Sequence, residues 1–456
     1  MDTYTIFTLS NNIPVLYIPR DQSISSIQVG IKVGSVNETS ILHGASHYLE
    51  HMLFKGTEKI KDSKEIFNKL YNKGAYINAF TGKENTNFLI KINSKYFESA
   101  ITILSDMLLH STLEHNEFEL EKLVVVEEIN QGLDEHSRLL VNMIHKIMFP
   151  QSVLEPEIPG TPESILALTR PSVMEYYKKY YCANNLFICI TSNLEIDIIK
   201  NMLIKSEFPN FPVHKLETVI YNTINQVNPN YSIIDKNLEQ IYIAIGFPTC
   251  NKFSEDKYVL DFIKILLGGN MNSRLFIDLR EKNGLSYQIL VNSMYYDSSG
   301  LFYIFTSFDK NSLYTLSTIE NSTLDSYLQN LFQNSKSEKP GALPIILDNL
   351  YRLQTELITD EELNNFKGFI EGNLQLFMED TENVVGYYST QLMYFHENIL
   401  TIQELIDKNN LITKEDIQRV SKKYFDFSKL NISILGNCNK SKLDSYVQKY
   451  INYHNQ

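Results

Sequence analysis

The feature that most constrains the fold of this chain is an internal repeat. Residues 178–193 read KKYYCANNLFICITSN and residues 422–437 read KKYFDFSKLNISILGN, at a constant offset without a gap (422 − 178 = 244). Before each copy, Thr169 or Thr413 precedes an apolar helical stripe and is predicted to cap a helix. A short apolar strand follows at 186–190 and at 430–435, and a turn then leads into a last helix. This colinear match predicts two copies of one α/β unit.

The remaining sequence can be divided around this repeat. We expect one domain over residues 1–215, a linker at 216–231 and a second domain over 232–456. The segment 208–230 carries three prolines and no sustained hydrophobic period, which is typical of a connection between domains. A second irregular stretch, 333–344, is predicted to be an exposed insertion.

Local patterns predict several elements of the first half. Residues 26–33 alternate apolar and polar side chains, which indicates a strand of a sheet with one buried face. The further predicted elements are a helix over 42–54 with Gly56 as its C-cap, a helix that follows a capping box of Asp62 and Glu65 and ends near Gly74, a hairpin over 75–92 that turns near 82–83, and a helix over 117–133.

Composition excludes several functional classes. The formal net charge is −13, from 41 basic and 54 acidic residues, and this argues against nucleic acid or an anionic membrane as the main partner. The four cysteines form no CxxC pair and no disulfide framework, which favours a reducing compartment. The N-terminal residues have no secretory pattern, and no apolar run reaches the ~18 residues that a membrane span needs. We therefore expect a cytoplasmic protein.

His47, Glu50 and His51 form the pattern HxxEH. Side chains at i and i+4 project from one face of a helix, so the two imidazoles can bind one metal ion together. Zn²⁺ accepts neutral imidazole and carboxylate ligands, and catalytic sites keep one position for water. Glu50 can reach such a water and act as the catalytic base, as in the inverzincins, which this motif defines. The motif alone leaves open a helix with two surface histidines.

A third ligand is expected from the helix predicted over 117–133. Glu121 and Glu128 lie two helical turns apart and share a stripe with the valines between them. Burying two carboxylates in such a stripe is costly unless a positive charge meets them. We therefore assign Glu128 as the third zinc ligand and Glu121 as a residue that orients a ligand. Solvated glutamates are the alternative, and they are our expectation for Glu119 and Glu127.

These residues resemble the pitrilysin family of zinc peptidases, which includes insulin-degrading enzyme and the mitochondrial processing peptidases. In that family a glutamate at a similar distance after the second histidine is the third ligand, and another glutamate lies seven residues earlier; here 128 − 51 = 77 and 128 − 121 = 7. The resemblance implies a zinc endopeptidase with one Zn²⁺ per chain. The segments that carry it are GSVNETSILHGASHYLEHMLFKGT (34–57), EKLVVVEEI (121–129), IPGTPESILALT (158–169), MNSRLFIDLREKNGLSY (271–287) and ITDEELNNFKGFIEGNLQLFMED (358–380).

The resemblance also implies a fold and an assembly. The fold class is α+β, with two homologous α/β domains that each pack a mostly antiparallel sheet with helices and together form one half of a clamshell. Because longer family members contain four such units, a chain of this length is expected to pair with a second chain. A homodimer is the economical expectation, and a heterodimer stays open. The expected substrate is a peptide or an unfolded protein.

Substrate-binding residues are likewise implied by the resemblance. In the family an Arg and a Tyr seven residues apart contact the substrate near the scissile bond, and Arg280 and Tyr287 match them here. The segment Asn78, Ala79, Phe80 and Thr81 matches a sheet edge to which the substrate adds as a strand. The alternatives are a surface salt bridge for Arg280 and ordinary packing for Tyr287.

Two rival functions remain at this point. A non-catalytic family member would act as a structural or peptide-binding subunit, but such proteins typically lose metal ligands, and every ligand is present here. An inert α/β binding protein with accidental histidines would require both the spacing and the extended matches to be coincidence.

Overall fold

The computed structural model describes residues 3–222, 225–314, 340–396 and 398–454. The chain divides into two compact units, each of which is described by itself. The first unit comprises Met1–Gln131, Pro156–Tyr221 and Glu371–Ile406, and the second comprises Gly132–Glu155, Asn222–Ile370 and Asp407–Gln456. Within the described ranges, no helix combines the length and the apolar character that crossing a membrane requires.

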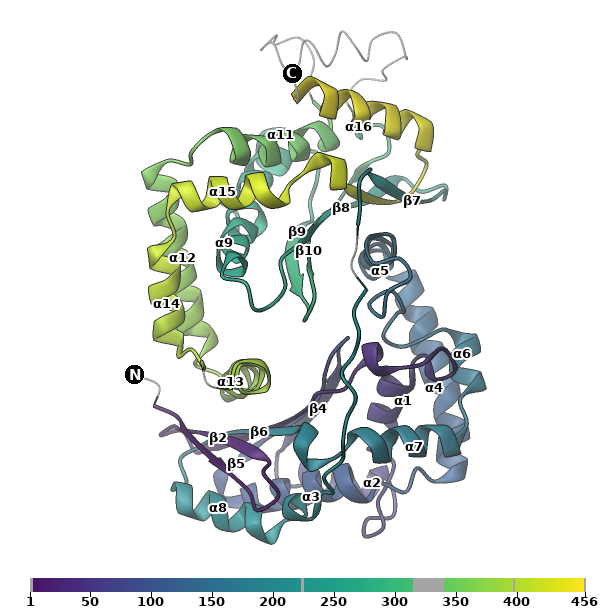
Figure 1. The fold of residues 1–456 in the computed structure, drawn as a ribbon, viewed down its shortest axis with the longest axis vertical. Coiled ribbons are helices and arrows are strands. Elements are labelled where there is room, and N and C mark those ends of the chain that lie inside the picture. Colours follow the sequence, from purple (N-terminus) through teal and green to yellow (C-terminus); the bar gives the residue numbers. More distant parts are fainter. Residues whose placement is uncertain (1–2, 223–224, 315–339, 397, 455–456) are drawn as a thin grey trace. The chain divides into compact units, whose positions relative to one another are not determined.

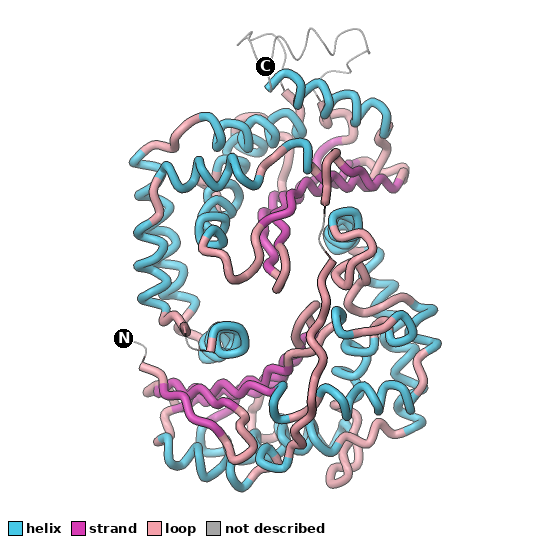
Figure 2. The backbone as a smooth tube through the Cα atoms, in the orientation of Figure 1, coloured by secondary structure: helices cyan, strands magenta, loops and turns pink. Residues whose placement is uncertain are grey.

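The first unit contains a six-stranded mixed sheet in the order β1-β2-β6-β3-β5-β4. Figure 1 labels β2, β4, β5 and β6 of this sheet, and Figure 2 shows its strands in magenta. Strands β2 and β6 are parallel, and the other neighbours are antiparallel. The strands are β1 (Thr5–Thr8), β2 (Pro14–Pro19), β3 (Ile24–Ile31), β4 (Tyr76–Thr81), β5 (Thr86–Asn93) and β6 (Leu186–Ser192). The helices are α1 (Ala45–Met52), α2 (Ser63–Tyr71), α3 (Phe97–His110), α4 (His115–Asp134), α6 (Pro162–Ala167), α7 (Arg170–Tyr180), α8 (Ile196–Lys205), α13 (Thr381–Phe395) and α14 (Ile402–Leu411).

The second unit contains a five-stranded sheet in the order β7-β11-β8-β10-β9. Only the β7–β11 pair is parallel. The strands are β7 (Asn230–Ile234), β8 (Gln240–Thr249), β9 (Ile289–Tyr295), β10 (Gly300–Asp309) and β11 (Asn431–Leu435). The helices are α5 (His136–Met148), α9 (Asp256–Gly268), the π-helical turn η6 (Phe276–Glu281), α11 (Ala342–Thr355), α12 (Asp360–Phe377), α15 (Lys414–Tyr424) and α16 (Lys440–His454). The boundaries between the units fall within α4, α12 and α14, which therefore run from one unit into the other.

The two sheets have the same topology, as the internal repeat predicts. The order β2-β6-β3-β5-β4 of the first unit corresponds to β7-β11-β8-β10-β9 of the second, with the parallel pair at the same place. The repeat itself forms α7–β6–α8 in one unit and α15–β11–α16 in the other. The hydroxyls of Thr169 and Thr413 accept hydrogen bonds from the backbone N–H groups of Ser172 and Asp416, so both predicted N-caps are confirmed. The α+β class with two related domains is confirmed as well.

Each unit takes a helix from the other half of the sequence. Helix α13 packs on β3 and β6 of the first unit, and α5 packs on β8 and β11 of the second. Ser26 on β3 donates a hydrogen bond to Thr381 of α13 (2.8 Å), and Ser433 on β11 donates to the carbonyl of Leu140 of α5 (2.9 Å). The sequence-based boundaries at 215 and 232 therefore describe the repeat, and the compact units are discontinuous in sequence.

The exchange of α13 explains why one sequence prediction was wrong. The alternation over residues 26–33 predicts one buried face, but β3 is buried on both faces. Ser26 and Gly30 lie on the face that α13 covers, and Gly30 leaves room for the helix: a Cβ there would lie 2.6 Å from Cε of Met393. The alternation of apolar and polar residues in β3 therefore reflects a face that is covered by a helix, and not a face in contact with water.

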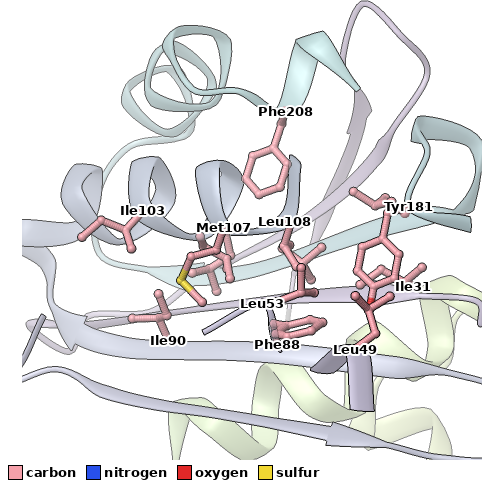
Figure 3. Close-up of a cluster of buried hydrophobic side chains, with 14 of the residues drawn as sticks. Ile31, Leu49, Leu53, Phe88, Ile90, Ile103, Met107, Leu108, Tyr181 and Phe208 are labelled. Atoms are coloured by element: carbon pink, nitrogen blue, oxygen red, sulfur yellow. The ribbon is translucent and has the colours of Figure 1, made fainter. Parts of the chain in front are cut away.

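The apolar core of the first unit lies between its sheet and helices α1 and α3. Figure 3 shows Leu49 and Leu53, from α1 and the residue that follows it, among side chains of β5 and α3. Leu49 and Leu53 are fully buried, and so is Met107 of α3. One face of α1 is therefore fixed in a close-packed interior, which limits where its opposite face can point.

Three local predictions need correction or completion. Helix α1 begins at Ala45 and ends at Met52, so it is shorter at both ends than the predicted 42–54, and Leu53 rather than Gly56 is its C-cap. Asp62 caps α2 as predicted, but the reciprocal bond of Glu65 goes to the N–H of Lys61. Of the insertion predicted at 333–344, residues 333–339 lie outside the described part of the chain. Residues 341–344 are buried at the start of α11, so the prediction that they are exposed is wrong.

Candidate metal centre

Helix α1 presents the two histidines of the HxxEH motif on one face. His47 and His51 lie one helical turn apart, and their ring centroids are 4.7 Å from each other. Tyr48, Leu49 and Met52 on the other sides of the helix are buried. Because these side chains anchor the helix in the core, the two imidazoles are directed toward α4.

Helix α4 brings Glu128 to the two imidazoles. Its Oε1 lies 3.5 Å from Nε2 of His47, and its Oε2 lies 3.4 Å from Nε2 of His51. One ligand atom from each of the three side chains lies within 4.8 Å of the other two. The Glu128 side chain is 36% exposed, so the cluster is open on one side. An open position is typical of catalytic zinc sites, whereas structural zinc sites are closed.

Glu121 orients His51 from the same helix. Nδ1 of His51 lies 2.9 Å from Oε1 of Glu121, and Lys55 contacts the other carboxylate oxygen. Burial raises the pKa of Glu121, but the hydrogen bonds from His51 and Lys55 outweigh this and lower it. An ionised Glu121 accepts the Nδ1–H of His51, which leaves Nε2, the nitrogen nearer Glu128, as the atom that could bind a metal ion.

The charges around His51 favour a bound cation. Burial alone lowers the pKa of His51, but hydrogen bonds with Glu121 and Glu128 raise it to about 9. This large shift reports a strongly negative environment. A histidine that binds a metal ion must be neutral. A divalent ion at this place would therefore replace the proton of His51 as the positive charge beside the two carboxylates.

Glu50 is buried beside the histidines and is held by the hairpin. Thr81, the last residue of β4, donates a hydrogen bond to Oε2 of Glu50 (2.6 Å). Burial raises the pKa of Glu50, and the bond from Thr81 opposes the shift. A carboxylate whose pKa is moved toward neutrality is better matched to accept a proton at physiological pH.

The segment from Asn78 to Thr81 lies on an edge strand. β4 is the last strand of the sheet, and among the described strands it pairs with β5 only. Asn78 and Phe80 are exposed, whereas Ala79 and Thr81 are partly buried. The free edge of β4 thus runs to the residue that contacts Glu50.

Arg280 and Tyr287 belong to the second unit. The guanidinium of Arg280 lies over the rings of Tyr287 and Phe276, at 4.5 and 4.8 Å from the centroids. Tyr287 is 80% exposed, which is unusual for a large aromatic side chain. Nε of Arg280 is 3.9 Å from Glu281, so the ion pair that would otherwise explain this arginine is loose. The structure therefore brings these two predicted residues to each other.

The residues present fit zinc. Two imidazole nitrogens and one carboxylate are a catalytic zinc donor set, and a carboxylate that fixes the tautomer of a ligand histidine is its usual support. His47, His51 and Glu128 would hold the ion, with Glu121 behind His51.

A second group of potential ligands in the first unit has a different explanation. Asp106, His110 and Glu207 also bring ligand atoms within 4.8 Å of one another. Lys59, however, contacts Glu207 and lies 3.7 Å from Oδ1 of Asp106, while the hydroxyl of Thr57 donates to Oδ2 of Asp106 (2.5 Å). The ammonium already pairs with both carboxylates, so we interpret this cluster as an ion-pair network.

Some functional contacts could not be predicted from the sequence. Thr81 was expected only as part of a substrate strand, and its bond to Glu50 depends on how the hairpin folds against α1. Lys55 lies beyond the end of α1, so its place beside Glu121 depends on the turn that follows the helix. Glu38, which binds the start of α1, gives no signal in a single sequence.

Two segments of the chain match known family models. Residues 15–161 match the family described as insulinase (peptidase family M16), and residues 167–367 match the peptidase M16 inactive domain. The HxxEH motif and Glu128 lie in the first segment, and Arg280 and Tyr287 lie in the second.

Related proteins carry zinc protease names. The chain is 27% identical to the uncharacterized zinc protease YmxG of Bacillus subtilis over 435 residues, which cover 94% of this chain and 98% of that protein. It is 29% identical to an uncharacterized zinc protease of Rickettsia bellii over 402 residues, which cover 86% of this chain and 87% of the relative. A solved structure of a protease from Helicobacter pylori shares the fold, with a TM-score of 0.83 and 19% identity over 96% of this chain and 100% of that one. The predicted resemblance is confirmed, and the chain belongs to the peptidase M16 family.

Proposed function

We propose that the protein is a zinc-dependent endopeptidase that hydrolyses peptides or unfolded protein segments. The observation that carries the proposal is the convergence of His47, His51 and Glu128 beside the buried carboxylate of Glu50. One zinc ion per chain, held by these three side chains, would supply a Lewis acid that polarises the scissile carbonyl and lowers the pKa of a coordinated water.

Glu50 performs the proton transfers in this mechanism. Thr81 holds one of its carboxylate oxygens, which orients the group and leaves the other oxygen to accept a proton from the attacking water. The same carboxyl then returns the proton to the leaving amine. Glu121 keeps His51 in the tautomer that presents Nε2 to the ion.

The edge of β4 is the proposed place of substrate binding. A peptide that pairs with Asn78–Thr81 gains main-chain hydrogen bonds irrespective of its sequence. Because Thr81 contacts Glu50, a strand added along this edge is led toward the catalytic base. Arg280 and Tyr287 are the proposed contacts to the substrate from the second unit.

The test is cleavage of a mixed peptide library by the purified protein, followed by mass spectrometry. We expect cleavage that a zinc chelator abolishes and added zinc restores. Glu50→Gln is expected to retain one zinc per chain and to lose about 100-fold or more of the activity, because it removes the general base. A chain that binds zinc and cleaves nothing would support the rival, a non-catalytic peptide-binding subunit, and Glu50→Gln with full activity would refute the assigned role.

We further propose that two identical chains pair and share their active sites, with a different partner chain as the alternative. Both the zinc ligands and the Arg280–Tyr287 pair are present in one chain, which supports identical partners. Mixing Glu50→Gln protein with Arg280→Ala protein should regain activity if each site draws on two chains. Absence of any regain after demonstrated subunit exchange would argue for sites within one chain.

We also propose that the protein is cytoplasmic, in line with its four free cysteines.

A further inference from the structure

The helix that carries both histidines starts without a cap of its own. The first N–H groups of a helix have no partner within it, and an N-cap side chain usually accepts one of them. The N-cap of α1 is Gly44, which has no side chain and adopts a φ of +91°. A Cβ at this position would lie 2.6 Å from Cδ1 of Ile165 and 2.8 Å from the carbonyl oxygen of Pro159, so the chain has no room for a capping residue here.

Glu38 accepts these hydrogen bonds from a distance in the sequence. The N–H of Gly44 donates to its Oε2 and the N–H of Ser46 donates to its Oε1, both at 2.8 Å. Gly44 and Ser46 are buried, so water cannot easily replace the carboxylate. A negative charge at this end also interacts favourably with the helix dipole. Ser46 directly precedes His47, so this cap holds the turn that presents the first histidine.

Glu38 is itself held against the hairpin that positions Glu50. It follows the short helix η1 (Ser35–Asn37), and its N–H donates to the carbonyl of Ser35 (3.2 Å). The N–H of Val36 donates to the carbonyl of Lys83 (2.9 Å), in the turn that follows Thr81. One short segment therefore joins the start of α1 to the turn after β4.

We propose that Glu38 is a positioning residue of the metal centre, whose ionised carboxylate fixes the start of α1 so that His47 and His51 face Glu128. The inference rests on the proposed function, because it concerns the same zinc site. Glu38 does not touch the ligands or the base. It acts on the backbone that carries the histidines, and through η1 and the hairpin turn it couples that backbone to Thr81 and Glu50.

The surroundings of Glu38 make this role sensitive to pH. Burial raises the pKa of Glu38 to about 7, against the opposing effect of the N–H groups of Ser46 and Gly44 and the charge of Lys83. Burial also lowers the pKa of Lys83 to about 8, so its charge changes within the same pH range. Tyr176 of α7 is also close to this carboxylate. Its phenol oxygen lies 2.7 Å from the hydroxyl of Ser46, and the charge of Glu38 contributes to the raised pKa of Tyr176. His43 contacts the carbonyl of Glu157. When the carboxyl of Glu38 is protonated, one of its two oxygens no longer accepts a hydrogen bond from a backbone N–H group. The cap is therefore complete above the pKa of Glu38 and incomplete below it.

The test compares zinc affinity of the full chain with that of Glu38→Gln by competition with a chromophoric chelator, from pH 6 to pH 8.5. The amide keeps one acceptor and turns a donor toward a backbone N–H. At pH 8 or above we expect zinc binding about tenfold weaker or more, as is typical when support around a ligand is lost. Near pH 6 the wild-type carboxyl is protonated, so the ratio of the two affinities should fall toward one.

The matched control is Asp62→Ala, which removes the cap of the neighbouring helix α2. Asp62 accepts the N–H of Glu65 (2.9 Å), and α2 carries no proposed ligand. This variant should lower the melting temperature and leave zinc affinity within about twofold of wild type, because the cap stabilises a helix outside the site. If Glu38→Gln does not fold, Glu38→Asp replaces it. The shorter carboxylate should weaken zinc binding at pH 8 and keep its dependence on pH.

The outcomes separate this inference from the proposed function. A wild-type chain that binds zinc while a folded Glu38→Gln chain binds it equally well at pH 8 overturns the inference alone. So does a loss that is the same at every pH, or one that Asp62→Ala reproduces. A wild-type chain that takes up no zinc overturns the proposed function, and the inference with it.

Discussion

At the scale of single residues, Glu121 shows how a carboxylate can serve a metal centre that it does not bind. It lies 2.9 Å from Nδ1 of His51, on the side of the ring away from Glu128. We expect Glu121→Gln to weaken zinc binding about 10- to 100-fold, because the amide is a weaker acceptor and no longer fixes the tautomer. Zinc affinity measured by chelator competition checks this. Glu119→Gln is the control on the same helix, since Glu119 is half-exposed and pairs with Lys122.

The residues of the site differ in how far they could be predicted. His47, Glu50 and His51 are neighbours along one helix, so their geometry follows from helical periodicity. Glu128 was found from its spacing of seven residues from Glu121, but the apolar stripe predicted between them is only half right, because Val125 is buried and Val124 is 53% exposed. The role of Glu38 depends on a loop that returns to the start of α1, and no periodicity describes such a loop. The substrate roles of Arg280 and Tyr287 stay predictions.

At the scale of elements, the ion-pair network around Glu207 ties the segment after α1 to α3 and α8. The hydrogen bond from Lys59, together with those from Asn210 and His110, lowers the pKa of Glu207 to about 2 from an ordinary 4.5. A carboxyl whose pKa is lowered on folding contributes stability that is present above its unfolded value and is lost as the pH falls through the folded one. The network should therefore lose its contribution between about pH 4.5 and pH 2.

We expect Glu207→Gln to be less stable than wild type at pH 7, by no more than about 1 kcal/mol because Lys59 is exposed. The difference in melting temperature should shrink as the pH is lowered from 5 and vanish near pH 2. Asp197→Asn is the control, since it removes an exposed pair with Lys200 within one helix. A difference that stays constant with pH would show that the ionised carboxylate is not the stabilising group.

At the scale of the whole molecule, the exchange of α5 and α13 lies beyond what sequence patterns can predict. Periodicity correctly indicated helices, strands and a duplicated unit, because those depend on residues close together in the chain. It indicates that one face of a helix is buried, but it does not identify the distant strand that buries it. For this reason β3 was predicted to have a solvent-facing side, whereas α13, encoded some 350 residues later (381 − 31 = 350), covers it.

The exchange of α5 and α13 predicts that a core substitution in either helix destabilises strands that belong to the other half of the sequence. Leu392 of α13 belongs to the same buried cluster as Leu16 and Phe187 of the first unit, whereas Leu140 of α5 is buried in the second. Each Leu→Ala change should cost about 2–5 kcal/mol. In hydrogen exchange measured by mass spectrometry, Leu392→Ala should reduce protection in β2 and β6 and leave β8 and β11 unchanged, and Leu140→Ala should do the reverse. If instead each substitution weakened the strands of its own half of the sequence, the units would be continuous and the exchange of helices would be refuted.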